Sequence, residues 1–147
     1  MQVTVAGIGP LRAGMSVRDA ATALHDSLTL PVGADTSACG TLAWRGGPPG
    51  VSVMFEHDRV ARVDIRSGSV ATDAGARIGD TESRIHSLYP GRVAVTPRKY
   101  TSGHYLTVSP AAAADSAFRI IFETDGVRVT GYRAGMLPQV AYVEGCG

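Results

Sequence analysis

Two segments of the chain match each other, and this internal match constrains the fold more than any other feature of the sequence. Residues 55–60 read FEHDRV and residues 122–127, which lie 67 positions later, read FETDGV. With the same offset, Arg66 and Gly68 align with Arg133 and Gly135. Positions 55–68 therefore contain six identities with the later segment, where unrelated segments of this length should share about one. The match predicts two tandem units, at about 7–72 and 73–147, inside a single domain that spans 1–147.

Each predicted unit begins with a helix. Ser16 has the chemistry of an N-cap, and the residues that follow it repeat apolar positions at the spacing of one helical stripe, which predicts a helix over 16–28 that ends near residues 31–33. In the second unit Asp80 or Thr81 caps a shorter helix that extends to Tyr89, before Pro90 and Gly91 end it.

Strands follow each helix. Apolar and other residues alternate over 51–56 and over 118–123, which is the period of a strand with one buried face. Asp125-Gly126 is a strong two-residue turn signal, whereas the first unit has Asp58-Arg59 there. That difference leaves the register of the following strand uncertain by one residue, so no inward face is assigned to it in the second unit.

Shorter strands are expected at 41–44 and 105–108. The predicted fold class is therefore α+β: two tandem repeats, each a helix followed by an antiparallel β-meander of at least three strands.

Charge and hydropathy exclude several classes of function. The net charge is +1, and no basic stripe is interleaved with aromatic residues, so we do not expect a nucleic-acid partner. No apolar run approaches the roughly 18 residues of a membrane span. Residues 1–14 lack the layout of a signal peptide, and Met1 is also compatible with a start placed after a removed export signal.

The two cysteines, Cys39 and Cys146, fit no zinc-ligand spacing and form no C-x-x-C pair. A single structural disulfide is the favoured interpretation. Two unrelated buried thiols in a cytosolic protein, or one catalytic thiol, are the alternatives.

Residue patterns that support catalysis are missing from the sequence. It contains no Gly-x-Ser-x-Gly, H-E-x-x-H, Walker or Gly-x-Gly-x-x-Gly pattern, and its histidines show no i, i+4 pair. Glu56 with Asp58, and Glu123 with Asp125, flank predicted turns, where Asp is favoured for local hydrogen bonding. We therefore predict no catalytic residue, no metal, no cofactor and no enzymatic activity.

Residues 9–17 (GPLRAGMSV) lead through Gly-Met-Ser into a helix, and Cys39 and the tail residues 133–135 and 144–146 follow. This pattern resembles uncharacterised exported proteins and lipoproteins of bacteria. The tandem plan is more distantly similar to beta-lactamase inhibitory protein and to small outer-membrane assembly lipoproteins. The resemblance implies a sheet whose concave face grips a protein partner, and a secreted or periplasmic location with an export signal or lipid anchor ahead of these residues.

Two sets of residues are candidates for a functional role. Arg66 and Arg133 are expected to form structural clamps with Asp64 or Glu144, or else to project into a partner site. The stronger binding candidate combines aromatic and cationic residues around a glycine turn, a composition typical of interface hot spots: Arg98, Lys99, Tyr100, His104 and Tyr105. The alternative is a hairpin turn with half-buried tyrosines; if both rings are buried, the sheet face around Met54 and Arg62 becomes the candidate.

These observations favour a non-enzymatic extracytoplasmic domain that binds another protein, such as an inhibitor or immunity protein for a secreted hydrolase. The alternative is a structural or assembly accessory of the bacterial cell envelope, and an unrecognised enzyme is the third hypothesis. The sequence leaves the oligomeric state open.

Overall fold

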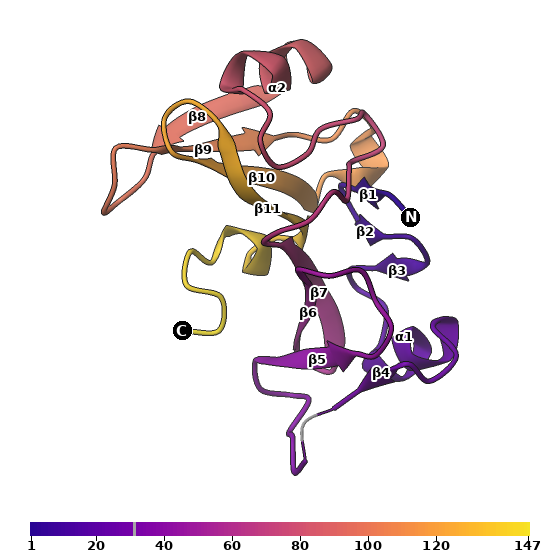
Figure 1. Cartoon of the computed structure of the whole chain (residues 1–147). Coiled ribbons are helices and arrows are strands. Elements are labelled where there is room, and N and C mark those ends of the chain that lie inside the picture. The colour runs from indigo at the N-terminus through magenta and orange to yellow at the C-terminus, as the bar shows by residue number, and fades with distance from the viewer. Residues whose placement is uncertain (31) are drawn as a thin grey trace.

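In the computed structural model, which describes residues 1–30 and 32–147, most of the regular secondary structure is β-strand. Strands β1 (Val3–Thr4), β2 (Gly7–Ile8) and β3 (Leu11–Arg12) form a small antiparallel sheet. The other eight form an antiparallel sheet in the order β4-β5-β6-β7-β11-β10-β9-β8 (Figure 1). Their bounds are β4 Leu28–Thr29, β5 Gly40–Trp44, β6 Val51–Glu56, β7 Arg59–Ile65, β8 Val93–Pro97, β9 His104–Val108, β10 Phe118–Thr124 and β11 Val129–Met136.

The predicted α+β class with tandem helix-and-strand repeats is wrong: the described part of the chain is predominantly antiparallel β, with two α-helices of 7 residues each. These are α1 (Val17–Ala23) and α2 (Glu82–Leu88). The first predicted helix ends early because His25 and Asp26 adopt positive φ angles of 52° and 62°. Leu28 fits the helical spacing but pairs with Trp44 in the sheet. The predicted end of that helix falls partly on Pro31, which lies outside the described residues.

Both helix starts were predicted correctly. The Ser16 side chain accepts a hydrogen bond from the Asp19 amide at 3.0 Å, and the Thr81 side chain accepts one from the Arg84 amide at 3.1 Å. Each bond satisfies an amide that has no partner inside the helix. Helices of two turns are marginal by themselves, so burial of Ala20 and Ile85 against the sheet is what holds them in place.

The hairpins β6-β7 and β10-β11 occupy the predicted ranges. However, residues that match in sequence do not occupy equivalent positions in the two hairpins. Phe55 pairs with Val60, and Thr124 pairs with Val129; each pair encloses a four-residue connection. Phe122, the residue matched to Phe55, lies two positions farther from its turn. A shift of two keeps the alternation of faces, which explains why the two segments agree in phase although their register differs.

The two hairpin turns also differ from the prediction. In the first, His57 and Asp58 carry the positive φ angles, 55° and 63°, that a tight hairpin turn requires. In the second, Asp125 precedes the tip: its carboxylate accepts hydrogen bonds from the amides of Val127 and Arg128, at 2.9 and 2.8 Å, around Gly126. The central pair is therefore one residue away from the predicted Asp125-Gly126.

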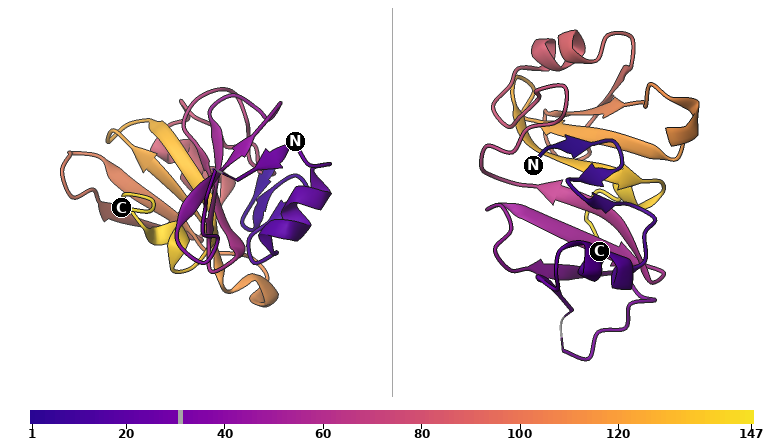
Figure 2. Two further views of the ribbon diagram at one scale, coloured as in Figure 1. Left: turned by 90° about the horizontal axis from the view of Figure 1, so that it is seen from below. Right: turned by 90° about the vertical axis from the view of Figure 1, so that its right-hand side faces the viewer.

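The eight-stranded sheet has two unlike faces. The core face carries the apolar cluster and is covered by α1, α2 and the β1–β3 sheet, while the C-terminal segment lies on the opposite face (Figure 2). On β11 the core face takes Tyr132 and Ala134, and Arg133 points to the opposite side; this settles the face that the sequence left open. The central strands supply the rest of the core: Val53, Phe55, Val60, Val63, Ile65, Leu106, Val108, Ile120 and Phe122.

The junction between β7 and β11 leaves no room for a side chain at Gly135. A Cβ atom built there would lie 2.3 Å from the carbonyl oxygen of Ala61 and 2.6 Å from the Cα of Arg62. We expect Gly135→Ala to lower the free energy of unfolding by about 1–3 kcal/mol, because the backbone must move. At Gly131, on the same strand, the nearest atom would be 3.2 Å away. Chemical denaturation should therefore show a clearly smaller loss for Gly131→Ala, and equal losses would contradict this account.

Candidate functional surface

The C-terminal segment returns across the sheet face opposite the core. A 3-10 turn, η2 (Gln139–Ala141), packs on β7, β10 and β11. The predicted disulfide between Cys39 and Cys146 is present and ties the end of the chain to the start of β5. Two buried arginines also hold the segment: Arg62 donates to the carbonyl oxygens of Gln139 at 2.9 Å and Tyr142 at 2.7 Å, and Arg133 donates to that of Val140 at 2.6 Å.

The same arginines belong to a charged cluster beneath the segment. Arg62 donates to Asp64 at 2.9 Å, Arg66 lies 3.4 Å from Asp64 and 3.2 Å from Glu123, and Arg133 pairs with Glu123. Arg62 and Arg133 are only 2% exposed. Burial lowers the pKa of Arg133, and the charge of Glu123 opposes this shift. The predicted clamp between Arg66 and Asp64 is confirmed, whereas Arg133 lies inside β11 and pairs with Glu123 instead.

Three hollows surround the C-terminal segment, and Val143 lines all of them. The central hollow, of about 440 Å³, lies over β5–β7 and includes Met54, Arg62 and Asp64. The inner hollow, of about 150 Å³, includes Tyr105 and Arg133. The outer hollow, of about 430 Å³, is lined by Lys99, Tyr100, Tyr142, Val143, Glu144, Gly145 and Gly147.

Four of the five residues predicted to bind a partner lie around the inner and outer hollows. Tyr100 is 76% exposed, and the ammonium group of Lys99 lies 5.3 Å from the centre of its ring. Tyr105 lines the inner hollow, where the guanidinium groups of Arg98 and Arg133 lie 5.8 and 5.6 Å from its ring centre. Arg98 donates a 3.0 Å hydrogen bond to the carbonyl oxygen of Thr124, which fixes its guanidinium group.

His104 is not part of this surface. It alternates with Tyr105 along β9, and its Nδ1 lies 2.8 Å from the Glu82 carboxylate at the start of α2. Thr124 also donates to that carboxylate. His104 therefore links β9 to α2 rather than lining a hollow.

The sequence prediction missed Tyr142 and Val143, which supply the other wall of the outer hollow. Both are partly exposed. The signal that could have found them is the predicted disulfide, because a bond from Cys146 to Cys39 carries the residues just before Cys146 back onto the sheet.

Glu82 makes stability depend on pH. Burial alone would raise the pKa of its carboxyl, but hydrogen bonds from Thr124 and His104 and the charge of His104 outweigh burial and lower it. A lowered folded-state pKa stabilises the fold above the unfolded-state value and loses that contribution as pH falls. We expect the stability of the wild type to fall as pH drops below about 4.5, and to fall less steeply in Glu82→Gln. Urea denaturation between pH 6 and pH 3 measures this; parallel profiles would contradict it.

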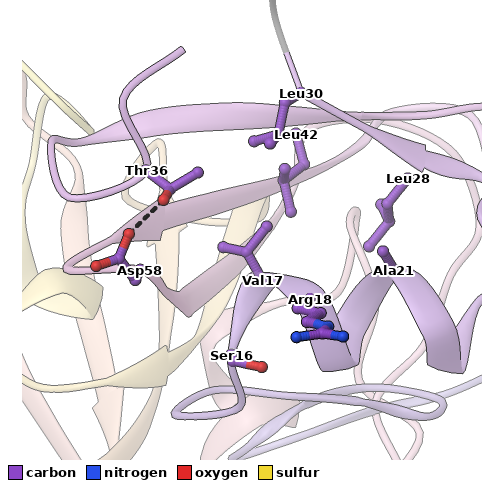
Figure 3. Close-up of a pocket in the computed structure, with 9 residues that line it drawn as sticks. All are labelled: Ser16, Val17, Arg18, Ala21, Leu28, Leu30, Thr36, Leu42 and Asp58. Carbon is purple, nitrogen blue, oxygen red and sulfur yellow. Dashed lines mark hydrogen bonds between the residues drawn. The ribbon is translucent and has the colours of Figure 1, made fainter.

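A separate apolar pocket of about 450 Å³ lies between α1 and strands β4 and β5, on the core side of the sheet (Figure 3). Leu28, Leu42 and Val17 form its walls, while a hydrogen bond from Thr36 to Asp58 closes one end. Its walls could hold a small apolar group. The polar residues that line it are Ser16, Arg18, Thr36 and Asp58.

Within residues 1–30 and 32–147, no group of three or more His, Cys, Asp or Glu side chains could hold a metal ion. No helix of that same part of the chain is long and apolar enough to cross a membrane.

The surface around the C-terminal segment combines exposed aromatic rings, fixed cations and peptide carbonyls, which are groups suited to recognition.

The fold and this surface define an antiparallel β-sheet domain whose C-terminal segment crosses one sheet face. No protein-family model matches the chain, and comparison with curated proteins finds no similar sequence. Among solved structures the chain is similar to the uncharacterized protein yfeY from Escherichia coli, with a TM-score of 0.54 and 14% identity over 92% of this chain and 99% of that one. At this identity the likeness shows the fold alone.

Proposed function

We propose that this chain is a non-enzymatic protein-binding domain that acts outside the cytoplasm, as an inhibitor or immunity protein for a secreted hydrolase. The observation that carries the proposal is the exposed ring of Tyr100 beside Lys99, in a hollow whose other wall is Tyr142 and Val143.

The energetics of this surface suit a protein partner. A tyrosine offers a large contact area and loses little rotamer entropy on binding, and Tyr100 is already held near Lys99 and the C-terminal segment. Arg98 is fixed by Thr124, so little ordering cost remains for the hairpin itself. Lys99 at the rim would mainly speed the encounter with an acidic partner.

The disulfide supports the proposed compartment. Cys146 is exposed, and a solvent-accessible disulfide persists in oxidising surroundings such as the periplasm or the extracellular space, whereas cytosolic thiol systems would reduce it.

Affinity capture from the native culture tests this proposal, with the wild type and Tyr100→Ala as baits. We expect the wild type to retain a specific protein and Tyr100→Ala to bind it at least about 30-fold more weakly, the equivalent of about 2 kcal/mol, with folding stability almost unchanged.

Val127→Ala is the matched control, because Val127 is 62% exposed at the β10-β11 turn and lines none of the three hollows. It should bind like the wild type. Equal retention by wild type and Tyr100→Ala, or unfolding of Tyr100→Ala, would contradict the proposal. A retained envelope-assembly protein in place of a hydrolase would replace the inhibitor role by that of an envelope accessory.

A further inference from the structure

We infer that residues 141–147, here called the strap, form a cover that a dithiol reductant releases, and that its release joins the central and inner hollows into one docking groove. The inference rests on the proposed binding function for the use of the groove. Release itself can be measured without any partner.

The strap is held very differently at its two ends. Just before it, Gln139 and Val140 are 6% and 0% exposed, so the segment stays anchored on the sheet at that end. Beyond Ala141 every strap residue is exposed or half-exposed, and in the described part of the chain the strap pairs with no strand. At its start, the amides of Ala141 and Tyr142 donate to the carbonyl oxygens of Pro138 and Gln139 at 3.0 Å, and Arg62 donates to the Tyr142 carbonyl at 2.7 Å. Farther along, the Gly147 amide donates to the Glu144 carbonyl within the strap itself.

The disulfide therefore supplies most of the hold on the far end. A single charge-assisted hydrogen bond contributes less than the backbone entropy that is gained when several exposed residues are freed. Arg62 would lose little, because it keeps Asp64 at 2.9 Å and the Gln139 carbonyl at 2.9 Å. Without the Cys39–Cys146 bond, the balance favours an open strap.

The strap also separates the hollows. Val143 lines the central, inner and outer hollows, and Gly145 lines the central and outer ones. When the strap leaves, the floor becomes continuous from Met54 and Arg62, over Arg133, to Tyr105. The freed guanidinium N–H of Arg62 then suits a partner segment that presents a carbonyl or carboxylate oxygen in place of Tyr142.

The release reaction is a thiol–disulfide exchange with a protein dithiol of the thioredoxin class. A thiolate of the dithiol attacks Sγ of the exposed Cys146, the Cys39–Cys146 bond breaks, and Cys39 leaves as a thiolate that takes up a proton. The second thiolate of the dithiol then attacks the mixed disulfide and frees Cys146. The protein gains two electrons and two protons, and the dithiol becomes a disulfide.

Backbone ¹⁵N relaxation of the full chain, oxidised and after reduction by dithiothreitol, tests the release. In the oxidised chain we expect order parameters near 0.85 for the strap; after reduction they should fall below about 0.6 for 141–147, while those of β6–β11 stay unchanged. Cys39→Ser leaves the strap sequence intact and should reproduce the reduced state. A strap that stays ordered after reduction overturns the inference, as does a general loss of strand signals, which would mean that the bond holds the whole fold.

The same two states, tested as baits in affinity capture, separate this inference from the proposed function. Stronger retention of the captured protein by the reduced chain supports a covered groove. Equal or weaker retention, with the strap shown to be mobile, overturns the covering role while leaving the protein-binding function standing. The absence of any captured protein in both states counts against the proposed function alone.

Discussion

Cys146→Ser is expected to lower the free energy of unfolding by about 2–4 kcal/mol. The disulfide closes a loop with a sequence separation of 107 residues, and cross-linking so long a loop removes much of the entropy of the unfolded chain. For a chain of this size the loss corresponds to a fall of about 5–15 °C in Tm. The fold itself should persist, because the core lies on the other face of the sheet.

Calorimetry or thermal circular dichroism of the wild type, with and without reductant, and of Cys146→Ser measures this effect. Reductant should lower the Tm of the wild type to that of Cys146→Ser and leave Cys146→Ser unchanged. Thiol titration of the unreduced native protein should count no free thiol. Two free thiols, or a Tm that reduction does not change, would remove both this prediction and the main support for an extracytoplasmic location.

Glu123→Gln should cause the other large loss of stability. Glu123 pairs with the buried Arg133 and also lies 3.2 Å from Arg66 and 3.9 Å from Arg98. Removing its charge leaves the Arg133 guanidinium buried without its counter-ion, and breaking a buried pair in this way costs about 3–5 kcal/mol. Urea denaturation at neutral pH gives the difference.

Glu144→Gln is the matched control: it makes the same chemical change on an exposed residue of the strap and should alter stability by no more than about 0.5 kcal/mol. Arg133→Met added to Glu123→Gln should recover part of the loss, because the uncompensated charge is then gone. A loss below about 1 kcal/mol for Glu123→Gln, or no recovery in the double variant, would show that the cluster is not a coupled unit.

Local signals in the sequence predicted local structure well. The caps at Ser16 and Thr81, the strands near 41–44 and 105–108 and both central hairpins depend on neighbouring residues, and all are present. The disulfide was found by eliminating other roles for two cysteines.

What failed depended on contacts between distant parts of the chain. Leu28 fits a helical stripe, yet α1 ends at Ala23 and Leu28 pairs with Trp44 in the sheet. The matched Phe55 and Phe122 lie two positions apart in register, a difference that the alternation of a strand cannot reveal. The very short strands β1–β4 contain too few residues for a period to be seen.

The sequence also predicted only those residues of the candidate site that are neighbours in the chain. Tyr100 and Lys99 are neighbours in the sequence, so their grouping could be read directly, while the opposite wall comes from Tyr142 and Val143, more than 40 positions away. His104 was included because it is adjacent in sequence, although strand alternation turns it toward Glu82.

Site-specific photo-crosslinking can show whether the protein binds a partner through the surface around Tyr100. A photoreactive phenylalanine analogue is placed at position 100, at position 143 or at position 127, and each protein is irradiated in the native culture supernatant or periplasmic extract. We expect positions 100 and 143 to crosslink to one and the same protein, and position 127, which lines none of the three hollows, to give no crosslink. Crosslinking from position 127 alone, or equally from all three positions, would contradict binding through this surface.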